Sequence, residues 1–226
     1  MKAQILPQLA SLRDNPEPLQ LVDLPDPTPG PGELLLRVLA CGVCHTELDE
    51  IEGRTPPALP VILGHQVVGR VAALGPGTSR FAVGDRVGVA WIFSACGQCP
   101  ACLAGDENLC PQFRATGRDA PGGYAELMAV PEAFAYPIPD VFSDVEAAPL
   151  LCAGAIGYRS LRLANLHDGQ PLGLTGFGGS GHLVLLLTRH LYPRSPVCVF
   201  ARSPDERAFA LELGAASTSE NTSGMG

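Results

Sequence analysis

The strongest constraint on the fold is a change of sequence pattern near residue 143. Before that point, prolines and glycines separate short apolar runs, among them residues 33–39, 66–74 and 86–91. Short strands between Gly/Pro turns are typical of an all-β barrel or sandwich. The first 140 residues therefore predict a β-rich domain.

Helices and strands are predicted to alternate after residue 143. Ser143 and Glu146 fit a helix capping box, and an apolar stretch at residues 147–166 follows them. Strand, helix, strand and helix are then expected in turn at residues 171–175, 181–191, 197–201 and 203–214. This order begins a doubly wound α/β domain. The small, polar residues 215–226 are expected to have no regular structure.

Composition excludes several function classes. Lys2 is the one lysine among 15 basic residues, which leaves no internal lysine for a Walker phosphate loop or a pyridoxal Schiff base. With a net charge of −8 and no basic run, the 226-residue chain is a poor binder of nucleic acid or anionic membranes. The sequence has neither an 18-residue apolar run nor a secretory signal, so we expect a cytoplasmic protein without a membrane span.

Four of the eight cysteines are packed closely together in the β-rich half. Gaps of two, two and seven residues separate Cys96, Cys99, Cys102 and Cys110. This spacing lets four thiolates surround one zinc ion, in a closed structural site that has no open position for catalysis. Two disulfides, free core thiols or an iron–sulfur cluster are the alternatives.

A second cysteine motif, Cys41-x2-Cys44, lies earlier in the same half. A redox dithiol would need this motif at a helix start in a thioredoxin-like βαβ unit. The β-rich surroundings argue against that function.

A glycine pattern follows the first strand expected in the α/β half. Gly176, Gly178 and Gly181 fit G-x-G-x-x-G between an expected strand and an expected helix. In dinucleotide-binding folds, such glycines let the backbone approach a pyrophosphate at the helix N-terminus. The alternative is a turn that only packs a helix closely on a strand.

The end of the next expected strand bears on the choice between NAD and NADP. Folds that bind NAD usually place an acid at this point. Here Arg202 and Ser203 follow the strand, and the nearest acid, Asp205, lies already in the next helix. Arg202 and Ser203 favour the 2′-phosphate of NADP over NAD. A solvated surface charge is the alternative interpretation of Arg202.

Several motifs occur in a fixed order along nearly the whole chain. They are residues 41–47, 64–75, 84–87, the four-cysteine lobe, 151–154 and 176–181. Together they resemble the zinc-dependent alcohol dehydrogenases of the medium-chain dehydrogenase/reductase superfamily. The resemblance implies a mixed β and α/β fold, with a GroES-like β-rich catalytic domain followed by the first part of a Rossmann fold.

The resemblance also implies roles for single residues. Cys44, His65 and Cys152 would bind a catalytic zinc and leave one position open for the substrate. Thr46 would pass the substrate proton outward, and Glu47 would act as an acceptor behind the ligands. The four-cysteine lobe would bind a second, structural zinc, which leaves Cys41 and Cys198 as packing residues. Cofactor contacts would come from His45, Gly176, Gly178, Gly179, Gly181, Arg202 and Ser203.

Three positions depart from the family pattern. Gln66 stands where the family usually has Glu beside the zinc histidine, Glu47 where Asp is common, and Asp49 where some members have a relaying His. The first change removes a negative charge near the metal. The second lengthens a side chain that orients a ligand, and such side chains tune the metal.

These observations predict two domains. We expect a GroES-like zinc-binding domain at residues 1–145, with its structural zinc lobe at 94–112, and a linking helix with an incomplete Rossmann domain at 146–226. A complete dinucleotide domain has two β-α-β-α-β halves, whereas about two strands are recognisable here.

We therefore interpret the chain as a C-terminally truncated oxidoreductase of alcohols and aldehydes or ketones. It would use two zinc ions and NADP or NAD, and its partner would be a small-molecule substrate. Intact family members are homo-oligomers, and the oligomeric state of this chain is left open. The alternatives are a catalytically inactive zinc-binding fragment and an electron-transfer or redox-sensing module built on the cysteine cluster.

Overall fold

The computed structural model describes residues 1–220. They form two compact units, of which the first is Met1–Cys152 and the second begins at Ala153. The sequence placed this division earlier, between residues 145 and 146. Helix α3 (Asp144–Ala147) and the 3-10 helix η3 (Ala148–Leu151) follow that point, but they pack against strands β3 and β5 and so belong to the first unit.

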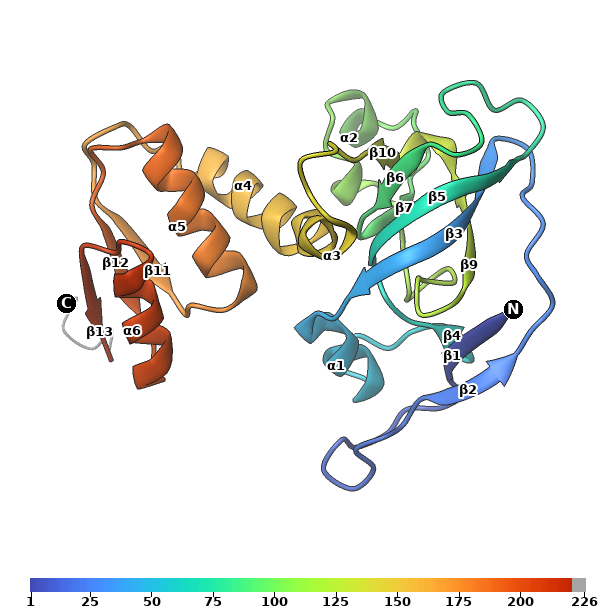
Figure 1. Cartoon of the computed structure of the whole chain (residues 1–226), viewed down its shortest axis with the longest axis horizontal. Helices are drawn as coiled ribbons and strands as arrows, with labels where there is room; N and C mark the ends of the chain where they lie inside the picture. The colour runs from blue at the N-terminus through green and yellow to red at the C-terminus, as the bar shows by residue number, and fades with distance from the viewer. Residues whose placement is uncertain (221–226) are drawn as a thin grey trace. The chain divides into compact units, whose positions relative to one another are not determined.

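The first unit is built around a five-stranded antiparallel sheet with the order β10-β6-β5-β3-β9 (Figure 1). Its strands are β3 (Glu33–Gly42), β5 (Gln66–Leu74), β6 (Arg86–Val89), β9 (Leu127–Pro131) and β10 (Ala135–Pro137). Leu34 and Leu36 on β3, and Met128 and Val130 on β9, are buried at alternate positions. Alternation with a period of two points these side chains to one face, where burial of each contributes about 1.5–3 kcal/mol.

Smaller elements complete the first unit. A second antiparallel sheet has the order β2-β1-β4, and a two-stranded sheet joins β7 to β8. The bounds are β1 (Lys2–Leu6), β2 (Gln20–Asp23), β4 (Val61–Ile62), β7 (Ile92–Ser94) and β8 (Arg114–Ala115). The short helices are α1 (His45–Ile51), α2 (Pro100–Leu103), η1 (Glu107–Leu109) and η2 (Glu132–Phe134). The first domain is thus the β-rich domain that the Gly/Pro pattern predicted.

The second unit has a three-stranded parallel sheet with the order β11-β12-β13. Its strands are β11 (Leu172–Thr175), β12 (Val197–Phe200) and β13 (Ser217–Ser219), and its helices are α4 (Ala153–Leu163), α5 (Gly179–Leu191) and α6 (Pro204–Glu212). The buried side chains of Phe177, Leu185, Val197 and Val199 belong to one apolar cluster in this unit. The β-α-β-α order read from the sequence is therefore confirmed.

Two expectations about the end of the chain need correction. Residues 215–226 were expected to have no regular structure, and about two strands were expected in this sheet. Ser217–Ser219 instead forms the third strand, β13, which pairs in parallel with β12. The sequence did not predict β13, because its residues are polar and lack an apolar pattern. The strand forms through hydrogen bonding to the neighbouring strand β12. Residues 221–226 lie outside the described residues.

The capping box that the sequence predicted at Ser143 is present. The Ser143 hydroxyl accepts a hydrogen bond from the Glu146 backbone N–H, and the Glu146 carboxylate accepts one from the Ser143 N–H. The Ser203 hydroxyl also caps a helix, α6, where it accepts a hydrogen bond from the Glu206 N–H at 3.4 Å. Within residues 1–220, no helix combines the length and the apolar character needed to cross a membrane.

Candidate functional site

Cys44 stands at the start of α1, two residues after β3 ends. Its backbone is extended (φ −123°, ψ 160°), and its N–H donates a 2.7 Å hydrogen bond to Oε2 of Glu47. This bond satisfies a backbone donor that the first helical turn leaves free. The Thr46 hydroxyl lies 3.5 Å from Cys44 Sγ. The start of α1 therefore brings a thiol, a hydroxyl and a carboxylate together.

His65 lies in the short link between β4 and β5 and is fully buried. Gly64 turns the chain into position with φ +95°, and a Cβ at Gly64 would stand 2.7 Å from the Cys41 sulfur. The Nδ1 atom of His65 is 2.7 Å from Glu47 Oε1. Trp91 meets the imidazole edge-on, with ring centroids 4.9 Å apart. The ring is thus held on two sides.

Cys152 follows η3 and completes the group. Its sulfur lies 3.9 Å from that of Cys44. One donor atom from each of Cys44, His65 and Cys152 lies within 4.8 Å of the other two. The structure therefore brings together three residues that are far apart in the sequence, and we call them the Cys44–His65–Cys152 centre.

Burial and mutual contact shift the acidity of this centre. The Cys152 thiol stabilises the thiolate of Cys44 and lowers the pKa of Cys44 to about 3, whereas the same contact raises the pKa of Cys152. Burial favours the neutral form of His65, but the Cys44 and Glu47 side chains outweigh it and raise the pKa of His65 to about 9. A deprotonated thiol is the form that binds a metal ion.

The donor set of the centre fits zinc. Two sulfurs and an imidazole are donors that zinc prefers, and three protein ligands leave a position open. Because Nδ1 of His65 faces Glu47, Nε2 is the ring atom available to a metal, and it makes no hydrogen bond to any described residue. A carboxylate on the second nitrogen of a ligating histidine fixes the ring orientation.

Three further residues singled out in the sequence differ in how far they are exposed to solvent. Gln66 is buried at the start of β5. Asp49 accepts a hydrogen bond from the Arg54 side chain at 2.5 Å and lies 3.7 Å from Nε2 of His45. The side chain of His45 is 76% exposed. Its role in cofactor binding stays a prediction.

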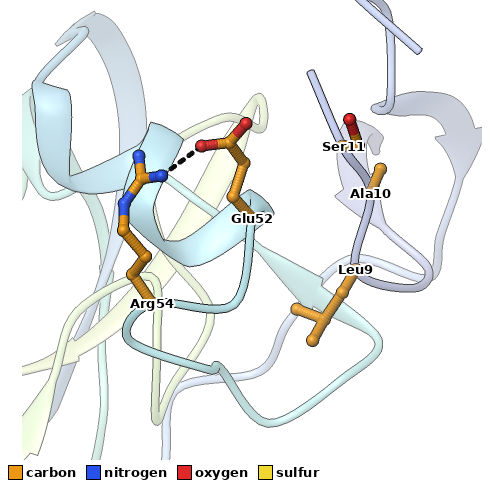
Figure 2. Close-up of a pocket in the computed structure, with 5 residues that line it drawn as sticks. All are labelled: Leu9, Ala10, Ser11, Glu52 and Arg54. Atoms are coloured by element: carbon orange, nitrogen blue, oxygen red, sulfur yellow. Dashed lines mark hydrogen bonds and ion pairs between the residues drawn. The ribbon is translucent and has the colours of Figure 1, made fainter. Parts of the chain in front are cut away.

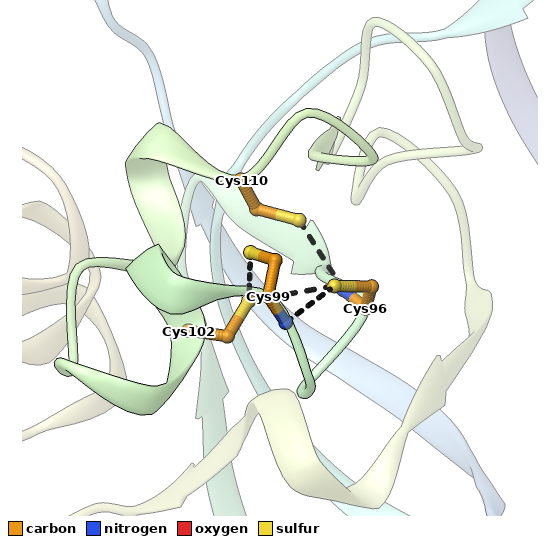
Figure 3. A group of neighbouring side chains, drawn as sticks. All are labelled: Cys96, Cys99, Cys102 and Cys110. Carbon is orange, nitrogen blue, oxygen red and sulfur yellow. Dashed lines mark hydrogen bonds between the residues drawn. The ribbon is translucent and has the colours of Figure 1, made fainter.

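The four cysteines of the predicted metal lobe also lie close together. Figure 3 shows the side chains of Cys96, Cys99, Cys102 and Cys110 turned toward one another, and their sulfurs all lie within 4.8 Å of one another. Cys96 and Cys102 sulfurs are 3.9 Å apart, and those of Cys99 and Cys102 are 3.5 Å apart. All eight cysteines are free, so the disulfide alternative finds no support in the structure.

Backbone amides favour thiolates in this lobe. The N–H groups of Cys99 and Gln112 donate to the sulfurs of Cys96 and Cys110, each at 3.3 Å. Backbone N–H groups of Gln98 and Cys99 lower the pKa of Cys96 to about 6. Four converging sulfurs with amide donors suit a closed tetrahedral metal site.

The glycine-rich turn of the second unit joins β11 to α5. A Cβ on Gly181 would come within 2.9 Å of the Gly176 carbonyl oxygen, so glycine allows a close approach there. The surroundings of Gly178 differ, since nothing lies within 4 Å of a Cβ added to it. Gly178 is the N-cap of α5, Gly179 is its first residue, and both are exposed. Exposed backbone at a helix N-terminus suits an anionic group.

Arg202 and Ser203 follow the C-terminal end of β12. Arg202 is exposed, and the Ser203 hydroxyl caps α6. Arg207 was not predicted, yet its Nη1 donates to the carbonyl oxygens of Ala201 and Arg202 at 2.7 and 2.8 Å. These bonds hold the backbone that carries Arg202. An arginine in the first turn of the helix after the strand was the available signal.

A surface hollow of about 430 Å³ has none of the candidate ligands in its lining (Figure 2). It is lined by Leu9, Ala10, Ser11, Glu52 and Arg54, and Figure 2 shows an ion pair between Glu52 and Arg54. The lining charges already neutralise each other. None of the predicted site residues lines this hollow.

The fold and the two cysteine-containing groups define a class of protein. A β-rich domain with two groups of possible metal ligands is followed in the sequence by a parallel sheet with a glycine-rich turn. Residues 30–140 match the family model of the alcohol dehydrogenase GroES-like domain. This match covers just under half of the chain, and most of the chain is similar to alcohol dehydrogenases.

Individual relatives agree with this family. The "Probable alcohol dehydrogenase AdhA" of Mycobacterium tuberculosis (strain CDC 1551 / Oshkosh) is 49% identical over 209 residues, which are 90% of this chain and 60% of the relative. The crystal structure of an NAD-dependent alcohol dehydrogenase has a TM-score of 0.88 and 31% identity, over 96% of this chain and 63% of that one. The cobalt- and zinc-bound thermostable alcohol dehydrogenase from Pyrobaculum aerophilum has a TM-score of 0.86 and 27% identity, over 96% and 65%. The chain therefore spans about 60% of the length of such relatives.

Proposed function

We propose that this chain carries the catalytic domain and part of the nucleotide domain of a zinc-dependent alcohol dehydrogenase. The reaction is the interconversion of an alcohol with an aldehyde or ketone, with hydride transfer to or from NAD(P). One observation carries the proposal, namely the convergence of Cys44, His65 and Cys152 to within 4.8 Å. Sequence spacing alone does not bring these residues together.

In this proposal the residues in and around the centre bind the metal, orient a ligand and transfer a proton. Cys44, Cys152 and Nε2 of His65 would hold zinc, which supplies a Lewis acid that lowers the pKa of an alcohol hydroxyl. Glu47 orients His65 through the 2.7 Å contact at Nδ1. The Thr46 hydroxyl lies 3.5 Å from Cys44 Sγ, where it can accept the proton of the substrate and pass it outward.

The four-cysteine lobe has a separate function in this proposal. Its four sulfurs fill a tetrahedral site and leave no position for a substrate. We therefore assign the second zinc to it, as a structural ion. We favour the cytoplasm for this chain, because a reducing compartment keeps cysteines available as metal ligands.

The second unit would bind the adenosine half of the cofactor. The exposed backbone at Gly176, Gly178 and Gly179 favours a pyrophosphate at the N-terminus of α5. Gly181 lets the helix approach the turn. We favour NADP over NAD, because exposed Arg202 offers a guanidinium to a 2′-phosphate.

An inactive metal-binding fragment is the second candidate function. The chain spans about 60% of the relatives' length, and its described part contains three strands of the parallel sheet. The test is NAD(P)-linked oxidation of a panel of primary alcohols by the purified, zinc-loaded chain. Turnover that is lost in Cys44→Ala supports the enzyme, whereas no turnover with zinc bound at both sites supports the fragment.

A further inference from the structure

Glu50 is a buried carboxyl that neither the sequence motifs nor the proposed reaction uses. It lies on α1, three residues after Glu47, and is 0% exposed. Residues three apart lie on the same face of a helix. Neither carboxylate oxygen of Glu50 accepts a hydrogen bond from any described residue. A buried carboxyl without a partner is costly, so its presence calls for an explanation.

The charges that act on Glu50 connect it with the metal centre. Burial and, to a smaller extent, the charge of Glu47 raise the pKa of Glu50 to about 7, while His65 and Arg118 act in the opposite direction. Arg118 already forms a 2.7 Å ion pair with Asp119. The strongest influences of single charges on Glu50 are thus those of Glu47 and His65.

Tyr124 supplies another unsatisfied group in the same region. Its hydroxyl is buried and has no hydrogen-bond partner within residues 1–220. Burial raises the pKa of Tyr124, and the charges of Glu47 and Glu50 add to this effect. Glu50 and Tyr124 thus both bury polar atoms without a partner among the described residues, and the charge of Glu47 acts on both.

The residue that follows His65 in the sequence suggests a role for Glu50. Gln66 is buried and neutral, and it stands where the family usually carries a carboxylate next to the zinc histidine. A centre that binds a divalent cation is stabilised by nearby negative charge. On α1, Glu50 provides a buried carboxyl from another direction.

We propose that Glu50 is a positioning residue of the Cys44–His65–Cys152 centre, supporting Glu47 and the histidine that Glu47 orients with the carboxyl that position 66 lacks. The inference rests on the proposed function, because it requires that this centre binds a metal ion. Glu50 acts through Glu47 and does not contact the metal. Loss of a group that supports a metal ligand in this way costs about tenfold or more in affinity.

The test compares cobalt(II) binding to the 226-residue chain and to Glu50→Gln. Competition with a chelator gives the affinity of each bound equivalent, and the visible spectrum reports the ligand geometry. We expect Glu50→Gln to weaken one of two equivalents about tenfold and to shift its absorption bands. The equivalent in the four-cysteine lobe stays unchanged and serves as an internal reference.

Glu52→Gln is the matched control. It removes the same charge at the end of the same helix, but the Glu52 side chain is 27% exposed and pairs with Arg54. Both cobalt equivalents should bind this variant as they bind the wild type. A tenfold loss in Glu52→Gln as well would show a general charge effect and overturn the assignment to Glu50.

Two further results would overturn the inference. Glu50→Gln could retain the wild-type affinity and spectrum, or it could lower only the unfolding temperature, which a merely structural role predicts. If Glu50→Gln does not fold, Glu50→Met keeps the side-chain length without a buried carboxyl, and the same tenfold loss is expected. If the wild type binds cobalt in the four-cysteine lobe alone, the proposed function fails first and the inference fails with it.

Discussion

Oε1 of Glu47 lies 2.7 Å from Nδ1 of His65, and both side chains are almost completely buried. The other Glu47 oxygen accepts the backbone N–H of Cys44 at 2.7 Å. One carboxylate thus joins two of the three proposed zinc ligands. Aspartate is common at this position in the family, and the longer glutamate still reaches the histidine here.

Replacing Glu47 should weaken metal binding at the centre. Glu47→Gln keeps the shape of the side chain but removes its charge, so His65 loses the anion that orients it. We expect zinc affinity to fall about 10- to 100-fold, as measured by competition with a chelator. Asp49→Asn, a charge removal at a more exposed position of α1, is the control. A Glu47→Gln affinity within twofold of the wild type would contradict this account.

Removing Cys152 should abolish the centre and leave the four-cysteine lobe intact. Cys152→Ser retains the size of the residue but takes away one of two sulfur donors. We expect the bound zinc to fall from two equivalents to one by elemental analysis. Cys198→Ser changes a cysteine of β12, outside both groups, and should keep two equivalents. Two equivalents in Cys152→Ser would rule out this ligand assignment.

The two metal groups differ in how far the sequence alone could predict them. The four-cysteine lobe is local, because Cys96 to Cys110 lie in one short segment whose spacing already implies a shared metal. Cys44, His65 and Cys152 are joined only by the fold, and the family resemblance was needed to group them. Their convergence depends on the start of α1, the turn at Gly64 and the end of η3.

Other features could not be predicted from the sequence, because they depend on contacts with neighbouring helices and strands. The strand β13 has the polar sequence Ser-Thr-Ser and forms by pairing with β12. Glu50 shares a helix face with Glu47, but its complete burial follows from what packs over α1. In contrast, β5 was predicted with its observed bounds, since Gly/Pro turns mark both of its ends.

Two glycines of the β11–α5 turn should respond differently to the same substitution. In Gly181→Ala, the added Cβ meets the Gly176 carbonyl oxygen at 2.9 Å, so the backbone must shift. We expect a loss of about 1–3 kcal/mol in the unfolding free energy, measured with urea. Gly178→Ala meets no atom within 4 Å and should keep its stability. Equal stability of the two variants would contradict the packing role of Gly181.

Arg202 should determine the preference for the 2′-phosphate. Arg202→Asp replaces an exposed guanidinium with a carboxylate, which repels a phosphate and suits a ribose hydroxyl. We expect NADP affinity to fall at least tenfold by calorimetry, while NAD affinity is retained or improves. The NAD measurement controls for damage to the site. Unchanged NADP affinity would contradict this role and favour the alternative, in which Arg202 is a solvated surface charge.

The number of zinc ions bound per chain tests the central claim most directly. Elemental analysis of the purified wild-type chain, combined with its protein concentration, gives this ratio in one measurement. We expect two zinc ions, one in the four-cysteine lobe and one held by Cys44, His65 and Cys152. A ratio of one or zero in the zinc-loaded chain would contradict that claim.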